Sequence, residues 1–206
     1  IFISTENITA MLFAMSGDDN AMLGFSTPTK LYVLDAIEPT PLEPQTELAY
    51  TDLGIVNPDI SGGCLGFQIV DGEPQPTTLW VLDKTARNIY HLGPFGPQGG
   101  PPTLQHTVSL SSIDGSNQAT GLSTNFWSGN TLLATPVDPS GWRMVQFPSN
   151  LNNPTEGDIV NTFSFDHAIS GLAFTAEELQ FHMVIDIWDN GLDDPEHHVF
   201  YGSGNN

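Results

Sequence analysis

A repeat with a period near 50 residues is the feature of this sequence that most restricts its fold. Four apolar segments each close on an Asp, at Leu31–Asp35, Leu79–Asp83, Leu132–Asp138 and Met183–Asp189. The closing Asp residues are 48, 55 and 51 positions apart. Spacing of this kind in a strand-rich sequence is typical of a repeated structural unit. We therefore expect a series of similar units, and not an enzyme built around one special site.

The repeated unit consists of short strands. The 16 Pro and 20 Gly residues are spread along the chain and interrupt every helical period, apart from one turn at Thr175–Glu178. Each unit can be written as four strands: the Asp-terminated segment is the second, and the fourth strand of the first unit is expected at Leu53–Val56. The first strand has a small-residue entry followed by Phe. These entries are Ile8–Phe13, Ile60–Phe67, Ala119–Phe126 and Ile169–Phe174. The pattern predicts an all-β fold.

The fourth unit stops one strand short. Its third strand, His198–Tyr201, is followed only by the turn-like Gly202–Asn206, while an apolar segment at Ile1–Ile3 precedes the first unit. We expect Ile1–Ser4 to complete the fourth unit, because closing a ring removes exposed sheet edges. The expected organisation is one domain over 1–206, with units at approximately 8–59, 60–117, 118–167 and 168–206 plus 1–4.

The Gly-Leu-x-Phe entry and the Leu-Tyr/Trp-Val-Leu-Asp strand resemble those of β-propeller repeat proteins. This resemblance implies a four-bladed β-propeller of four-stranded antiparallel blades, with the N-terminal strand completing the last blade. The two motifs are shared by many propellers and indicate no narrower family. Two other architectures stay open: half of an eight-bladed ring made by two chains, and a β-sandwich.

The charge of the chain excludes several partners. There are 24 Asp and Glu residues against 4 Lys and Arg residues, a formal net charge of −20. Such a surface repels the nucleic-acid backbone and anionic lipids, and no apolar run approaches the ~20 residues of a membrane span. It attracts cations instead. We expect no nucleic-acid partner and no membrane insertion, and the acidity fits either solubility in salty surroundings or calcium binding.

The termini and the single cysteine suggest the location. Cys64 is the only cysteine, so the chain forms no internal disulfide. The sequence starts at Ile1 without an initiator Met, which is expected after removal of a signal peptide. We expect an extracellular, secreted protein.

Candidate metal ligands cluster in one loop. The segment Asp186–Glu196 contains five carboxylates, an Asn and a Gly, which suits a cation that takes six to eight oxygen ligands. The spacing is not that of an EF-hand, because Trp188 and His197 occupy ligand positions. The expected calcium ligands are Asp186, Asp189, Asn190, Asp193, Asp194 and Glu196, with Asp18 and Asp19 as a weaker second group. The four repeated Asp residues are explained first as turn caps.

Two tryptophans are candidate ligand contacts. Trp127 and Trp142 lie at expected strand ends, where an indole can stack on a sugar ring. The adjacent His197 and His198 point to opposite faces of a strand, which argues against a shared zinc ion. His91, His106 and His167 are scattered in the sequence and indicate no site.

The leading hypothesis is a non-enzymatic structural subunit. Nucleophile motifs and phosphate-binding loops are absent from the sequence. A bare repeat domain with strand-forming ends fits a homo-oligomer or polymer, such as a filament, sheath or surface layer, with calcium ordering its loops. The first alternative is a carbohydrate- or ligand-binding module, and the second is a hydrolase or lyase that uses channel carboxylates.

Overall fold

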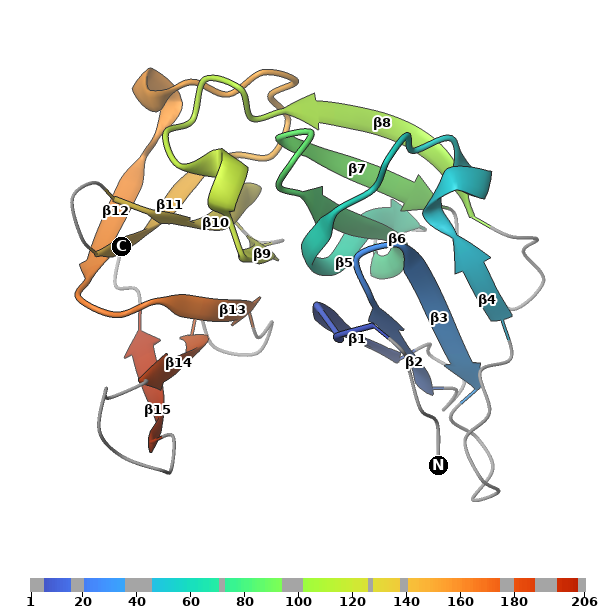
Figure 1. The fold of residues 1–206 in the computed structure, drawn as a ribbon, viewed down its shortest axis with the longest axis horizontal. Helices are drawn as coiled ribbons and strands as arrows, with labels where there is room; N and C mark the ends of the chain where they lie inside the picture. Colours follow the sequence, from blue (N-terminus) through green and yellow to red (C-terminus); the bar gives the residue numbers. More distant parts are fainter. Residues whose placement is uncertain are drawn as a thin grey trace. The chain divides into compact units, whose positions relative to one another are not determined.

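The computed structural model describes residues 6–15, 21–35, 46–70, 73–93, 102–125, 128–137, 141–174, 180–187 and 196–203. The chain divides into two compact units, Ile1–Thr107 and Val108–Asn206. In the described ranges the regular structure is antiparallel strands and three short 3₁₀ helices, without an α-helix (Figure 1). No described helix is long and apolar enough to cross a membrane. The predicted all-β class is confirmed.

The first sheet contains four strands in sequence order. They are β1 (Ala10–Met15), β2 (Ala21–Ser26), β3 (Lys30–Asp35) and β4 (Thr46–Ala49). A tight turn joins β2 to β3, where the amide of Thr27 donates to the carbonyl of Lys30 at 2.9 Å. The 3₁₀ helix η1 (Tyr50–Leu53) follows β4 and ends at Gly54, whose φ of 88° lies in the left-handed region.

Two expectations for this first sheet were wrong. The segment Leu31–Asp35 belongs to the third strand, and not to the second, because Ala21–Ser26 supplies a strand that the sequence pattern did not identify. The expected fourth strand at Leu53–Val56 is not a strand, since η1 and Gly54 occupy its start. The repeated Asp-terminated motif therefore marks different strands in different sheets.

The second sheet follows the same up-and-down order. Its strands are β5 (Ile60–Val70), β6 (Glu73–Asp83), β7 (Asn88–Gly93) and β8 (Thr103–Ser109). The ladder between β5 and β6 shifts register at Ile60/Gly62 and again at Gly66/Gln68. Such bulges increase the local twist of a strand pair.

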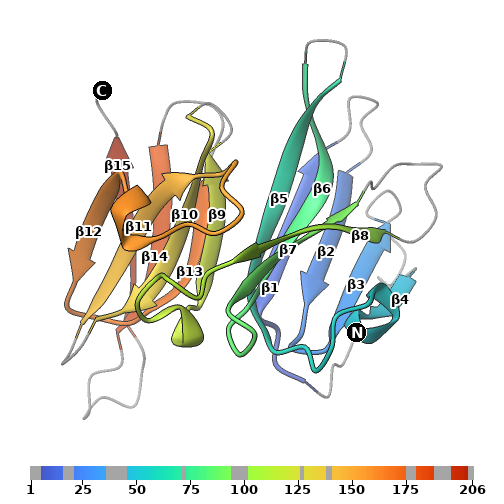
Figure 2. The ribbon, with the colours of Figure 1, turned by 90° about the horizontal axis from the view of Figure 1, so that it is seen from above.

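A shared core joins these two sheets, which lie as neighbouring layers in Figure 2. Alternate residues of β6 and β7 point into it: Leu79 and Val81 from one strand, Tyr90 and Leu92 from the other. They pack against Leu31 of β3, Tyr50 of η1, Ile55 of the connection that follows η1, and Ile60 at the start of β5.

The second unit contains one four-stranded and one three-stranded sheet. The first is β9 (Gly121–Asn125), β10 (Asn130–Pro136), β11 (Trp142–Pro148) and β12 (Asn161–Phe165), and the second is β13 (Ile169–Phe174), β14 (Gln180–Ile187) and β15 (Glu196–Ser203). The 3₁₀ helices η2 (Ser116–Gln118) and η3 (Glu156–Asp158) lie in the connections.

The strands β9 and β13 join the two sheets of this unit. The hydroxyl of Thr120 donates to the carbonyl of Ile169. A side chain at Gly121 would meet Leu172, since an ideal Cβ there lies 2.9 Å from Leu172 Cγ. Ile169 also packs with Leu132, Ala134 and Met144 in a second core.

The predicted four-stranded antiparallel sheets are confirmed for three of the four sheets. The fourth has three strands in the described part of the chain, as expected from the sequence. The segment Ile1–Ser4, predicted to complete it, lies outside the described residues.

Candidate functional site

A row of aromatic side chains crosses the second sheet. Trp80 of β6 lies directly opposite His91 of β7 in the antiparallel ladder. Their rings stack with centroids 3.8 Å apart and an interplanar angle of 10°. His106 of β8 continues the row, with its ring centroid 5.3 Å from that of His91 and an interplanar angle of 62°.

Strand alternation puts this row on the face of the second sheet that points away from the core of the first unit. Leu79 and Val81 point into that core, so Trp80 between them points to the other face of the sheet. The same alternation in β7 separates His91 from Tyr90 and Leu92. The sheet thus presents an apolar face to its neighbour and a Trp–His row on its reverse.

Gly66 makes room for the tryptophan. An ideal Cβ at this position would lie 2.3 Å from Trp80 Nε1 and 2.2 Å from Thr78 Oγ1. Any side chain on Gly66 would therefore displace the indole. The missing Cβ thus allows the indole of Trp80 to lie over Gly66 and to stack on His91.

His91 differs from the rest of the row because it has a buried nitrogen without a partner and a lowered pKa. Among the described residues its Nε2 is the one buried side-chain nitrogen or oxygen without a hydrogen-bond partner. Burial, and secondarily the nearby His106, lowers the pKa of His91 to about 4, so the ring is neutral at pH 7. Leaving a buried polar atom unpaired costs about 1–3 kcal/mol, so such an atom commonly has an ordered water or an ion as its partner.

The sequence did not identify this row. His91 and His106 are 15 positions apart in the sequence and indicate no site there. The adjacent strands β7 and β8 bring their rings together, which the spacing alone does not show. The sequence does show that both histidines lie inside consecutive expected strands. Composition does not show the register that aligns their two side chains.

Asp83 is a turn cap, as the sequence predicted. It is fully buried, and its carboxylate accepts the amide of Ala86 at 2.9 Å and the amide of Asp59 at 3.3 Å. Asp59 in turn accepts the hydroxyl of Thr85 at 2.7 Å. These bonds tie the β6–β7 turn to the segment that leads into β5.

Two of the predicted calcium ligands, Asp186 and Glu196, lie on described strands of the fourth sheet. Glu196 begins β15 opposite Ile187, and Asp186 of β14 lies opposite His197. The remaining predicted ligands lie outside the described residues: Asp189, Asn190, Asp193 and Asp194 in the connection between these strands, and Asp18 and Asp19 near the N-terminus. Within the described ranges no group of three or more His, Cys, Asp or Glu residues is placed to hold a metal ion. Calcium binding stays a prediction.

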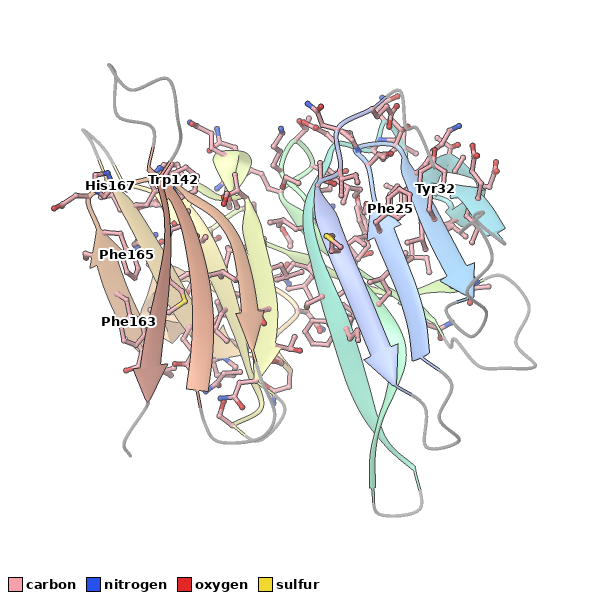
Figure 3. The ribbon with its side chains drawn as sticks, turned by 90° about the horizontal axis from the view of Figure 1, so that it is seen from below. Phe25, Tyr32, Trp142, Phe163, Phe165 and His167 are labelled. Atoms are coloured by element: carbon pink, nitrogen blue, oxygen red, sulfur yellow. The ribbon has the colours of Figure 1, made fainter. Side chains whose placement is uncertain are left out.

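Of the two predicted sugar contacts, the structure describes one. Trp142 begins β11, is partly buried and packs against the core around Leu132 and Met144 (Figure 3). It pairs across the ladder with Phe165 of β12. Trp127 lies outside the described residues.

β15 is the last strand of the fourth sheet, and it is longer than the last strand of each of the other three sheets. β15 contains eight residues, against four in β4, seven in β8 and five in β12. In the described part of the chain, β14 is its one strand partner. Its other side is therefore a candidate for strand addition, since an open edge offers amides and carbonyls to a further strand.

Comparison with solved structures finds chains of similar fold and low sequence identity. The hydrazine synthase of Kuenenia stuttgartiensis matches 97% of this chain and 47% of its own length, with 9% identity and a TM-score of 0.53. The Cps50 (Swd1) beta-propeller domain of Myceliophteria thermophila matches 86% of this chain and 50% of its own length, with 13% identity and a TM-score of 0.46. This chain thus spans about half the length of these two solved structures. No protein-family model matches the sequence, and no curated protein matches it significantly.

Proposed function

We propose that this chain, whose antiparallel sheets resemble the blades of a β-propeller, is an extracellular, non-enzymatic subunit that assembles with copies of itself. The resulting structure is a filament, sheath or surface layer. The observation that supports this is the three-stranded fourth sheet beside three sheets of four strands in the described part of the chain. The fourth strand is Ile1–Ser4, so the full architecture is a four-bladed propeller.

Strand exchange between copies is the proposed means of assembly. An apolar segment such as Ile1-Phe2-Ile3 gains backbone hydrogen bonds when it pairs with the open edge of β15. If the segment comes from a neighbouring copy, each copy both donates and accepts one strand. Such a head-to-tail contact produces an open polymer unless the rotation closes it into a ring.

Calcium is the proposed control on this assembly. Copies with a net charge of −20 repel one another, so association requires cations that screen or bridge the charge. The acidic connection between β14 and β15 is next to the proposed docking strand. Calcium bound by Asp186, Asp189, Asn190, Asp193, Asp194 and Glu196 would order the β14–β15 hairpin and favour strand addition.

The test is particle size in solution as a function of calcium. We expect light scattering to report large particles in CaCl₂, and small ones in excess EDTA or in MgCl₂ of equal ionic strength. The double substitution Ile1→Asp with Ile3→Asp is expected to abolish the large particles. Ile8→Asp is the matched control, because Ile8 is exposed and precedes the first strand. A protein that stays monomeric at every calcium concentration contradicts the proposal.

A closed dimer is the second candidate for the assembled form. It is favoured by the observation that this chain spans about half of the hydrazine synthase structure that it matches. Two copies would then form one eight-bladed ring, and sedimentation would show a discrete dimer that does not grow with protein concentration. An open polymer grows with concentration, so one sedimentation series separates the two forms.

A further inference from the structure

We propose that His91 and His106 bind a divalent first-row transition-metal ion, such as zinc or copper, on the second sheet. The proposal does not depend on the assembly function. It rests on three observations within one unit: two imidazoles on adjacent strands, the separation of their rings, and a buried ring nitrogen without a partner.

The separation of the two rings fits a shared ion. With metal–nitrogen distances of ~2.0–2.1 Å and tetrahedral angles, two imidazoles on one ion have ring centres about 5 Å apart. The centroids of His91 and His106 are 5.3 Å apart. The rings therefore do not need to move apart or together to share one ion.

The unpartnered Nε2 of His91 determines which class of metal ion would bind. A neutral imidazole nitrogen is a preferred ligand of zinc, copper and nickel, and a poor ligand of calcium or magnesium. The stack on Trp80 fixes the plane of the His91 ring, as partners around a metal ligand commonly do. An ion at this place would satisfy the nitrogen that no described protein group satisfies. Water would complete the coordination from the side of His106, whose side chain is only partly buried.

Tryptophan fluorescence offers a direct readout. Trp80 stacks on His91 with ring centroids 3.8 Å apart, so bound Cu²⁺ would quench its emission at short range. We expect saturable quenching on titration with CuCl₂. Electron paramagnetic resonance of the first bound equivalent should show coupling to two imidazole nitrogens. Calorimetry with ZnCl₂ should give one site of matching stoichiometry.

Substitutions assign the binding to the pair. His91→Phe keeps an aromatic ring on Trp80 and removes both nitrogens, so we expect at least a tenfold loss of Cu²⁺ affinity. His106→Gln should cause a similar loss, and it serves as the second variant if His91→Phe unfolds the sheet. His167→Phe is the matched control, because His167 is an exposed histidine of the other unit (Figure 3). It should titrate like the wild type.

Three outcomes would overturn the proposal. The first is the absence of saturable quenching in the wild type, which would mean that a water molecule or nothing fills the place of the ion. The second is equal affinity in the wild type, His91→Phe and His106→Gln, which would place any bound copper at other histidines. The third is a resonance spectrum unchanged by His91→Phe.

Discussion

Tyr50 has the largest fully buried side chain in the described part of the chain. It packs among Leu31, Ile60 and Leu79, and its hydroxyl shares a hydrogen bond of 2.7 Å with the hydroxyl of Ser26. Burial raises the pKa of Tyr50, so the phenol is protonated at every ordinary pH. One polar atom is thereby accommodated in an otherwise apolar core.

Removing that hydroxyl should destabilise the first unit. We expect Tyr50→Phe to lower the free energy of unfolding by about 1–2 kcal/mol, because Ser26 loses a buried partner. Urea denaturation measures the change. Ser26→Ala and the double variant complete a mutant cycle, and the double variant should cost less than the sum of the two singles. Strict additivity would contradict a direct bond between the two hydroxyls.

Arg143 makes the most extensive set of polar contacts of any described residue in the second unit. Its guanidinium donates to both carboxylate oxygens of Glu156, to the carbonyl of Asp114 and to the hydroxyl of Thr135. Glu156 also accepts the amide of Asp114 at 2.7 Å. One residue of β11 thus holds the loop before η2 and the turn at η3 together.

The carboxylate of Glu156 should make stability depend on acid pH. The hydrogen bonds from Arg143 hold the pKa of Glu156 below its usual value. A lowered folded-state pKa stabilises the protein above the unfolded value of about 4.3, and this contribution is lost as the pH falls through the folded pKa. We expect Glu156→Gln to lower the urea midpoint at pH 7, and the difference from wild type to shrink towards pH 3.

The control for this experiment is Asp52→Asn, an exposed carboxylate of the other unit. It should leave the midpoint nearly unchanged at both pH values. A Glu156→Gln difference that is constant from pH 7 to pH 3 would show that the charge of Glu156 plays no part.

At the scale of the strand, alternation is the part of the fold that the sequence predicts well. Leu79 and Val81 of β6 and Tyr90 and Leu92 of β7 alternate into the core, and the predicted strands of the second, third and fourth sheets lie close to those in the structure. The first sheet was misassigned because Met22-Leu23-Gly24-Phe25 is short and contains Gly, and because the Asp-terminated motif was assumed to mark the same strand in every unit.

Gly66 tests how tightly β5 and β6 are packed. We expect Gly66→Ala to cost about 1–3 kcal/mol of stability, because the new Cβ meets the indole of Trp80 and overpacking strains a sheet. The emission of Trp80 should change as the indole moves. Gly171→Ala in β13 is the matched control, since a Cβ there meets nothing within 4 Å. A Gly66→Ala protein as stable as wild type would mean that Trp80 has room to move.

At the scale of the whole molecule, charge dominates. With 24 acidic and 4 basic residues, the folded chain carries strong self-repulsion that salt relieves. We expect the urea midpoint to rise between ~10 mM and ~150 mM NaCl, as the Debye length falls from ~30 Å to ~8 Å.

Calcium separates screening from specific binding. At equal ionic strength, CaCl₂ should raise the midpoint more than NaCl or MgCl₂ if the acidic loop of the fourth unit is a calcium site. Equal urea midpoints in the three salts would mean that charge screening alone stabilises the protein. That result would contradict the predicted calcium ligands.

The candidate site was predicted less well than the fold. A repeat can be recognised in the sequence, because it requires only a regular spacing of similar segments. The stack of Trp80, His91 and His106 needs the register of three strands, and a slip of one residue would turn His91 to the opposite face. The buried nitrogen also depends on packing, which no local pattern encodes.

The ladders between consecutive strands have a consequence for how this protein is made. In the described antiparallel ladders the widest pairs, such as Ile60 with Asp83 and Trp142 with Phe165, join residues 23 positions apart. Each hairpin can therefore form soon after its own residues leave the ribosome, because its pairing does not require residues that are synthesised much later. The side of β15 that has no strand partner in the described part of the chain is the exception, since a strand from Ile1–Ser4 would come from the opposite end of the chain or from another molecule. Completion of the last sheet would then be the slow, final step of biosynthesis.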